Sequence, residues 1–378
     1  MDFDFTEEQQ NLRDLAREIL EQEVTQKRLA AIEAGDDGLR RELWQKLAAA
    51  NLLGLAVPEQ YGGMGYGITE LFVFLVELGR AVAPVPALPT LVLAGLPIHR
   101  FGTDAQRERW LTRIASGAAI LSGAYVDANS ADVTAPATSA RRDGSGHRLS
   151  GAKRFVPAAD VAERIVVPAA TEAGVALFLV DPRADGAAAT RQEATNGEAI
   201  FDLELANVFV PDEDLLGGDP AGGKAKLAWT HDCALTAVAA QQLGVSERAV
   251  EITTAYVSQR EQFGAPIGSF PAVQHRCADM FIDLNALRWT MWHATSRLAR
   301  DVEASREAMV AKIWTGEAGS RIANASQHLH GGAGVDRDYL LHRYFLWSKS
   351  NELTFGAAMP QLARLGRDMA RTGPQELA

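Results

Sequence analysis

The apolar residues of this chain change their spacing twice along its length, and this change limits the fold more than any single motif. Up to about residue 118 they recur at helical intervals, as Leu12, Leu15 and Ile19 illustrate. Short β-rich runs separated by turn residues follow, and after Gly222-Gly223 the helical spacing resumes. Since 378 residues exceed one ordinary core, the sequence predicts three domains, at residues 1–118, 119–222 and 223–378.

Specific patterns predict the elements within these domains. Thr6 and Gln9 have the spacing of a capping box, and the stretch from Ile68 to Leu78, apolar on nearly all sides, predicts a buried helix. The strands expected in the middle domain are residues 148–156, 164–167, 175–180 and 200–205. The long helices expected after them are residues 232–259, 270–301 and 306–329, with one more near the end. The fold class is therefore α+β, with an N-terminal helical domain, a middle antiparallel β-domain and a C-terminal four-helix bundle.

Charge and cysteine content exclude several classes of protein. The net charge is −11 and the pI about 5.3, so nucleic-acid binding is not expected, although helix ends and a few cations can still bind the phosphates of a small anionic ligand. Cys233 and Cys277 lie in helix-like stretches without metal-ligand spacing, which indicates reduced thiols and no metal. The N-terminus carries no signal-peptide pattern, and the most apolar run, Leu71–Leu78, contains Glu77 and is too short to span a bilayer. We therefore expect a cytoplasmic protein without membrane insertion.

Four local motifs, in chain order, resemble those of one known protein family. Leu53–Gly63 resembles that family's N-terminal "GL…PEEYGG" turn, and Asn207–Gly217 resembles the strand that leaves its β-domain. Arg260–Met280 resembles the "R-x-Q-F-G-x-P-I…A-D-M" segment, and His330–Gly334 resembles the "HGGxG" loop. One such motif is weak evidence, but four in order and correctly spaced cover essentially the whole chain. The chain thus resembles the flavin-dependent acyl-CoA dehydrogenase family, which implies the α, β, α architecture, FAD as the cofactor and an acyl-CoA as the substrate.

The same resemblance implies a set of flavin-binding residues. In this family the flavin lies extended between the β-domain and the C-terminal bundle, and its adenosine diphosphate half reaches a neighbouring subunit. An arginine can pair with the pyrophosphate, and glycines let backbone N–H groups approach it. The implied residues here are Arg260, Gln262, Phe263, Gln327, His328, Gly331, Gly332 and Phe155. Outside this context, Arg260 would be a surface arginine at a helix end and Phe263 a core aromatic.

The catalytic base is where the resemblance breaks. The family's reaction removes the α-proton of an acyl thioester while the β-hydrogen leaves as hydride to the flavin, and a desolvated carboxylate takes the proton. Most members place a Glu before a Gly in a segment reading "IYEGT", which ungapped counting matches to Leu353–Ala357. Phe355 occupies the Glu position and cannot accept a proton.

The alternative base position of the family is also occupied by an apolar residue. A minority of members place the base on the long helix before "R-x-Q-F-G", next to an Arg, and counting back from Arg260 gives Ala234 and Leu235. Asp232 and Glu352 are the nearest acids, and each is either a relocated base or a solvent-exposed charge.

The β-domain motifs depart from the family as well. The usual "TEPxAGSD" is Tyr125–Asp132 here, and the usual "W/F-I-T" is Phe155-Val156-Pro157, so hydroxyls that face the flavin and the thioester are missing. A Gln that normally precedes "VHGG" appears as His328, with Gln327 one place earlier. The motifs that hold the dinucleotide are therefore better kept than those that face the isoalloxazine ring.

Three hypotheses follow from this pattern. The first is the subunit without a base in a heteromeric acyl-CoA dehydrogenase of the bacterial steroid or lipid-CoA type. The second is a self-sufficient homotetramer that uses Glu352 or Asp232 as its base. The third is a catalytically silent protein that binds CoA or flavin. The resemblance implies an electron-transfer flavoprotein as the electron acceptor of any active complex.

Overall fold

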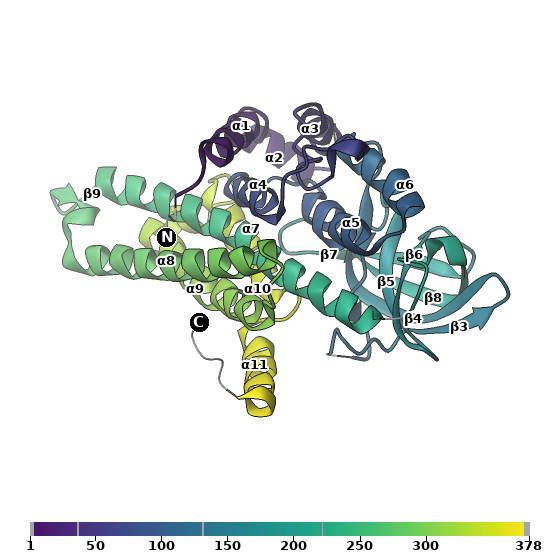
Figure 1. Ribbon diagram of the computed structural model, residues 1–378. Coiled ribbons are helices and arrows are strands. Elements are labelled where there is room, and N and C mark those ends of the chain that lie inside the picture. The colour runs from purple at the N-terminus through teal and green to yellow at the C-terminus, as the bar shows by residue number, and fades with distance from the viewer. Residues whose placement is uncertain (1–3, 36–37, 131, 221, 374–378) are drawn as a thin grey trace. The chain divides into compact units, whose positions relative to one another are not determined.

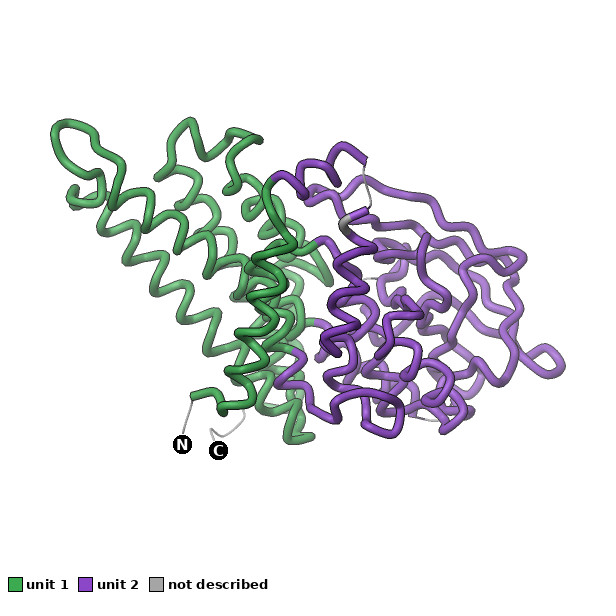
Figure 2. The backbone as a smooth tube through the Cα atoms, turned by 90° about the horizontal axis from the view of Figure 1, so that it is seen from above, with its two compact units in different colours: residues 1–26, 72–83, 235–378 green, residues 27–71, 84–234 purple. Residues whose placement is uncertain are grey.

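The structure is a computed structural model that describes residues 4–35, 38–130, 132–220 and 222–373. The chain divides into two compact units, shown in green and purple in Figure 2. The bundle unit contains residues 1–26, 72–83 and 235–378, and the sheet unit contains residues 27–71 and 84–234. The N-terminal helices are thus divided between the two units. Figure 1 shows the predicted order of N-terminal helices, β-strands and C-terminal helices, which confirms the fold class.

The sheet unit is built around one eight-stranded sheet. Its strands are β1 (Leu121–Gly123), β2 (Val126–Asp127), β3 (Ser139–Asp143), β4 (Gly146–Pro157), β5 (Arg164–Thr171), β6 (Gly174–Val180), β7 (Ala187–Glu193) and β8 (Ala199–Pro211). The order β1-β5-β3-β4-β8-β7 forms the main path, with β2 beside β4 and β6 beside β5. Along each strand, side chains alternate between the two faces, and inward-facing ones such as Leu149 of β4, Phe178 of β6 and Leu203 of β8 are fully buried in the core.

The antiparallel prediction holds for most of this sheet but not for all of it. β4 with β8, β7 with β8, β5 with β6 and β3 with β4 pair antiparallel. β1 pairs parallel to β5, with Leu121 opposite Arg164, and β3 meets β5 in parallel at Ser139. Parallel pairing is possible because a long stretch of chain separates the strands of each of these pairs and allows a crossover.

Short helices complete the sheet unit. They are α2 (Gln26–Glu33), α3 (Gly38–Ala49), η1 (Glu59–Tyr61), η2 (Leu88–Gly95), α5 (Leu96–Phe101), α6 (Asp104–Ala115) and η3 (Asp212–Asp214). α6 begins with a capping box in which Thr103 accepts from the Gln106 amide. The indole of Trp44 donates to the carbonyl of Gly117 at 3.0 Å, which ties α3 to the end of α6.

The bundle unit contains the long helices. They are α1 (Glu7–Glu23), α8 (Pro271–Ala299), α9 (Ser305–His330), α10 (Leu341–Leu353), α11 (Ala358–Thr372) and most of both α4 (Ile68–Ala81) and α7 (Gly223–Gln259). A short hairpin of β9 (Glu261–Gln262) and β10 (Ala265–Pro266), followed by η4 (Ile267–Ser269), joins α7 to α8 (Figure 1). The turn η5 (Gly331–Val335) follows α9. Within the described residues, no helix is both long enough and apolar enough to cross a lipid bilayer.

Two glycines let α4 and α7 pack with their backbones in direct contact. A Cβ on Gly79 would lie 2.0 Å from the Gln241 carbonyl oxygen, and one on Gly244 would lie 1.9 Å from that of Val76. Any larger residue would force the helices apart. The predicted buried helix from residue 68 is therefore confirmed, and its burial depends on glycine in both helices.

Candidate functional site

Arg260 and Phe263 lie on the hairpin at the end of α7. The backbone turns there through two left-handed residues, Phe263 with φ of 55° and Gly264 with φ of 80°. This turn leaves the Phe263 side chain 95% exposed, so the alternative of a core aromatic is wrong. Gln262 and Arg260 are exposed too, and Arg260 makes no ion pair within the described part of the chain. An uncompensated guanidinium beside an exposed ring suits an anionic, aromatic ligand.

The glycine loop after α9 is open. Gly331 has φ of 58°, and a Cβ on Gly331 or Gly332 would meet no atom within 4 Å. Gln327, on the last turn of α9, donates from Nε2 to the Gly334 carbonyl at 3.3 Å and so braces the loop. The packing of this chain alone therefore leaves space at both glycines for another molecule.

His330 joins the hairpin to the glycine loop. Its ring stacks on Tyr256 with centroids 4.2 Å apart, and the Tyr256 carbonyl accepts from the Arg260 amide. Nδ1 of His330 bonds the Ser326 carbonyl at 2.8 Å, whereas its buried Nε2 has no hydrogen-bond partner among the described residues. Burial lowers the pKa of this imidazole, which keeps it neutral. Through these contacts, Arg260 and Gly331 lie at the same end of the bundle unit.

His328 lies in a different place from His330. It is exposed and lines a groove of about 660 Å³ between α8 and α9. Arg276, Asp283 and Arg321 line the same groove, and Arg321 forms a bidentate pair with Asp283 at 2.7 and 2.8 Å. The His328 side chain therefore lies among mixed charges, whereas the Gln327 side chain braces the glycine loop; His328 contributes only its carbonyl, which accepts from the Gly331 amide.

The turn that matches the family's "IYEGT" segment is closed by apolar side chains. Phe355 and Gly356 are both left-handed, with φ of 57° and 94°. Phe355 packs against an apolar cluster formed by Leu235, Ala308 and Met309. Leu235, the position of the family's alternative arginine, belongs to this cluster, and its neighbour Ala234 occupies the alternative base position.

The two acids considered as relocated bases are not solvent-exposed charges, so that alternative is wrong for both. Asp232 is buried, as is its neighbour Ala234, and both belong to the sheet unit. The Glu352 side chain is 20% exposed and pairs with Lys349 at 2.5 Å. The Glu352 carboxylate is therefore already engaged by an ammonium group.

Phe155 lies on β4 at a register shift between Lys153 and Val156. The irregularity gives Phe155 a left-handed backbone, with φ of 56°, and leaves its ring 65% exposed on the sheet unit. Val156 points into the core and the Pro157 carbonyl accepts from Ser122 at 2.5 Å, so this strand presents no hydroxyl beside the ring.

The "TEPxAGSD" counterpart has acquired a structural role. The buried Tyr125 hydroxyl donates to the Leu93 carbonyl at 2.6 Å, and burial raises its pKa. Asp127 accepts from the ammonium of Lys153 at 2.7 Å and from the Thr138 hydroxyl at 2.6 Å in the interior. Sequence analysis missed this pair, although Lys153 has the same strand parity as the buried Leu149. Ala131 of this segment lies outside the described residues.

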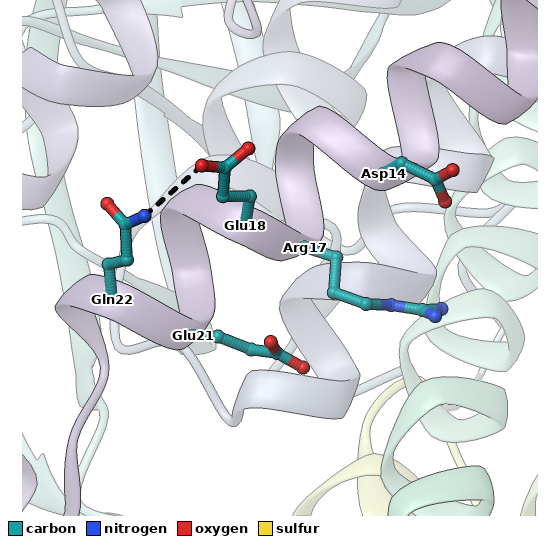
Figure 3. A pocket seen from close by; sticks show the side chains of 5 residues that line it. All are labelled: Asp14, Arg17, Glu18, Glu21 and Gln22. Carbon is teal, nitrogen blue, oxygen red and sulfur yellow. Dashed lines mark hydrogen bonds between the residues drawn. The ribbon is translucent and has the colours of Figure 1, made fainter.

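A further hollow lies on α1 and offers no comparable site. Figure 3 shows its lining side chains, Asp14, Arg17, Glu18, Glu21 and Gln22. Gln22 donates to Glu18 at 3.3 Å, and Arg17 forms a bidentate pair with the buried Glu77 of α4. The hollow is predominantly acidic and its single cation is already paired, so it does not suit a phosphate-bearing ligand.

Comparisons with known proteins agree with this geometry. The family model for the acyl-CoA dehydrogenase N-terminal domain matches residues 6–118, and the model for the C-terminal domain matches residues 234–370. The chain is 38% identical to acyl-CoA dehydrogenase FadE27 of Mycobacterium tuberculosis over 98% of this chain and 100% of that protein. It belongs to the acyl-CoA dehydrogenase family. The members of this family are FAD-dependent oxidoreductases, so the predicted family, enzyme class and cofactor are confirmed.

Two solved structures are similar over nearly the whole chain. A variant of the Tcur3481-Tcur3483 steroid ACAD is 43% identical, with a TM-score of 0.90, and the match covers 97% of this chain and 98% of that one. The ChsE4-ChsE5 complex from Mycobacterium tuberculosis is 37% identical, with a TM-score of 0.93, and the match covers 99% of this chain and all of that one. Both names describe assemblies of two different proteins.

Proposed function

We propose that this chain is the subunit without a catalytic base in a heteromeric acyl-CoA dehydrogenase that acts on a steroid-type CoA thioester. The observation that carries the proposal is that neither base position is titratable, since Phe355 packs against an apolar cluster that includes Leu235, and the neighbouring Ala234 is buried. The names of the two similar assemblies, one of which is called a steroid ACAD, support the pairing and the substrate class.

The residues of the bundle unit fit an FAD dinucleotide. Arg260 has a free guanidinium for the pyrophosphate, and the open space at Gly331 and Gly332 leaves room for a phosphate beside the loop backbone. The buried Nε2 of neutral His330, which lacks a partner among the described residues, can accept a hydrogen bond at this end. When bound, the flavin supplies a hydride acceptor.

The base that removes the α-proton has to come from another subunit of the assembly. The Phe355 ring has no site for a proton, and Glu352 is held by Lys349. A carboxylate of the related subunit would take the α-proton, while this chain contributes Arg260 and the glycine loop to the binding of the dinucleotide. We assign the same electron acceptor as the resemblance implies, an electron-transfer flavoprotein, and keep the cytoplasm as the predicted location.

The proposal is tested by expressing the chain alone and together with a related acyl-CoA dehydrogenase chain from the same genome. The visible absorption spectrum then gives the flavin bound per chain, and dye reduction with steroid-type and short linear acyl-CoA gives turnover. We expect little flavin and no turnover for the chain alone, and both in a stable complex. Turnover by the chain alone would overturn the proposal, and its loss in Glu352→Gln or Asp232→Asn would then identify a relocated base. Flavin binding without turnover in either preparation would indicate a silent binding protein.

A further inference from the structure

The C-terminus of α10 is capped by a side chain from another helix. The last four carbonyls of a helix lack partners within it. Here the Ser350 carbonyl accepts from the Thr354 amide at 3.0 Å, and the Leu353 carbonyl accepts from the Gly356 amide at 3.0 Å. The two carbonyls between them, of Asn351 and Glu352, accept from the ammonium group of Lys312 at 3.0 and 2.8 Å.

Lys312 reaches this position from inside the bundle unit. It lies on α9, and its side chain is fully buried. The carboxylate of Glu352 is turned to Lys349, so the bonds made by Lys312 go to main-chain oxygens. Burial lowers the pKa of this lysine to about 7, with the Glu352 carboxylate acting in the opposite direction. Two carbonyl acceptors match the two hydrogens that a neutral amine retains, so the cap can persist when the proton is lost.

The residues that Lys312 caps lead directly into the turn with Phe355. α7 holds the same end of α10, because the Asn351 side chain donates to Gln242 at 3.1 Å. α11 holds the far side of the turn, because Gln361 donates to the Phe355 carbonyl at 2.7 Å. Between these two points lie two consecutive left-handed residues, Phe355 and Gly356, a conformation that a non-glycine residue rarely adopts without support.

We infer that Lys312 is a positioning residue, which fixes the backbone of the turn at residues 353–357 by capping α10 and thereby holds the Phe355 ring in its apolar cluster. The inference does not depend on which subunit supplies the base, because it concerns contacts within the bundle unit. It assigns a function to a buried lysine that the proposed chemistry does not use.

Hydrogen–deuterium exchange on the full chain, alone and in its complex, tests this inference. Lys312→Met keeps the apolar stem of the side chain but removes the nitrogen that makes both hydrogen bonds. We expect the amides of Thr354 and Gly356 to exchange at least tenfold faster, with the strands of the sheet unit and the middle of α9 unchanged. Lys349→Met, which removes a lysine from the same corner without touching these carbonyls, should leave the turn as it is.

The outcomes separate a local role from general stability. Unchanged exchange in the turn of Lys312→Met, or an equal rise throughout the chain, would overturn the inference. If this variant does not fold, the wild-type chain gives the answer through reductive methylation with formaldehyde, followed by mass spectrometry. Lys312 should then be modified no faster than the turn amides open, whereas exposed Lys224 reacts at once. Modification of Lys312 while those amides remain protected would equally count against it.

Discussion

Two regions of the bundle unit that match motifs of the family's site differ in how open they are. The hairpin with Arg260 and the glycine loop are open, with an exposed cation and glycines that face free space. The turn at residues 353–357 is closed, capped by Lys312 and filled by Phe355 against Leu235 and Met309. The first region needs only backbone N–H groups and one guanidinium to bind phosphate, whereas the second needs a desolvated carboxylate for its chemistry.

The residues suited to binding a dinucleotide and the position of the catalytic base are therefore separate parts of the fold, and one can be kept without the other. An open loop is not needed for the bundle unit to pack, since a Cβ on Gly331 or Gly332 would meet nothing. The turn, by contrast, is anchored to an apolar cluster through the partly buried side chain of Phe355. A chain that keeps one and closes the other is suited to share its chemistry with a related subunit.

The largest expected effect concerns the closed region and its dependence on pH. The pKa of Lys312 is lowered by burial to about 7, so between about pH 7 and 10 the unfolded chain binds one proton more than the folded chain. The free energy of unfolding of the wild type relative to Lys312→Met should therefore rise with pH, by about 1.4 kcal/mol per pH unit and about 4 kcal/mol in all. Urea unfolding of both proteins at several pH values measures this difference. A flat difference would mean that the amine is not desolvated.

The second prediction tries to reopen the turn. Phe355→Glu places a carboxylate in the cluster of Leu235, Ala308 and Met309, so we expect a loss of about 3 kcal/mol in unfolding free energy at pH 8. The loss should shrink on acidification, because desolvation raises the pKa of the new carboxyl group above its value in the unfolded chain. Phe355→Leu is the matched control and should cost much less. We expect no turnover by the variant alone, and turnover would show that one residue separates this chain from a complete enzyme.

The third prediction concerns the open region. Arg260→Ala should weaken FAD binding in the complex by about 2 kcal/mol, roughly thirtyfold, because a charge-assisted bond to a phosphate is removed. Arg260→Lys keeps the charge but not the planar fork and should be intermediate. Flavin fluorescence on titration of the apoprotein measures the affinity. The unfolding free energy should not change, since Arg260 makes no ion pair in the described part of the chain. Equal affinity of all three proteins would remove Arg260 from the site.

The fold was predictable where local pattern and burial agree. The stretch from residue 68 is apolar all round and forms the buried helix α4. Strand β7 was missed because most of the side chains from Ala187 to Glu193 are exposed and show no alternation. The start of α7 was placed at residue 232 instead of Gly223, where a Cβ would lie 1.7 Å from the Val175 carbonyl oxygen. A glycine required by a contact between distant segments resembles a loop signal in the sequence.

The candidate site divides in the same way. The sequence motifs predicted the hairpin and the glycine loop, because each is formed by a few consecutive residues whose pattern can be read directly. The apolar packing of Phe355 and its support by Lys312 could not be predicted, since Lys312 lies more than forty residues earlier on another helix. Nothing local in the sequence distinguishes Lys312 from an exposed lysine of an amphipathic helix. Only the meeting of α9 with the end of α10 gives it a role.

The smallest expected effect separates backbone strain from ligand contact in the glycine loop. Gly331 and Gly332 are neighbours with equally free surroundings, but only Gly331 has a left-handed φ, of 58°. Gly331→Ala should therefore cost about 1 kcal/mol in unfolding free energy, and Gly332→Ala should change it by less than about 0.5 kcal/mol. If a phosphate approaches this backbone, both variants should bind FAD more weakly in the complex, because each new methyl group takes the space that the packing leaves free. Gly332→Ala is the decisive variant, since its expected effect on folding is small. Unchanged FAD affinity in that variant would mean that the open loop serves another purpose, and the contrast with the closed turn would then rest on Arg260 alone.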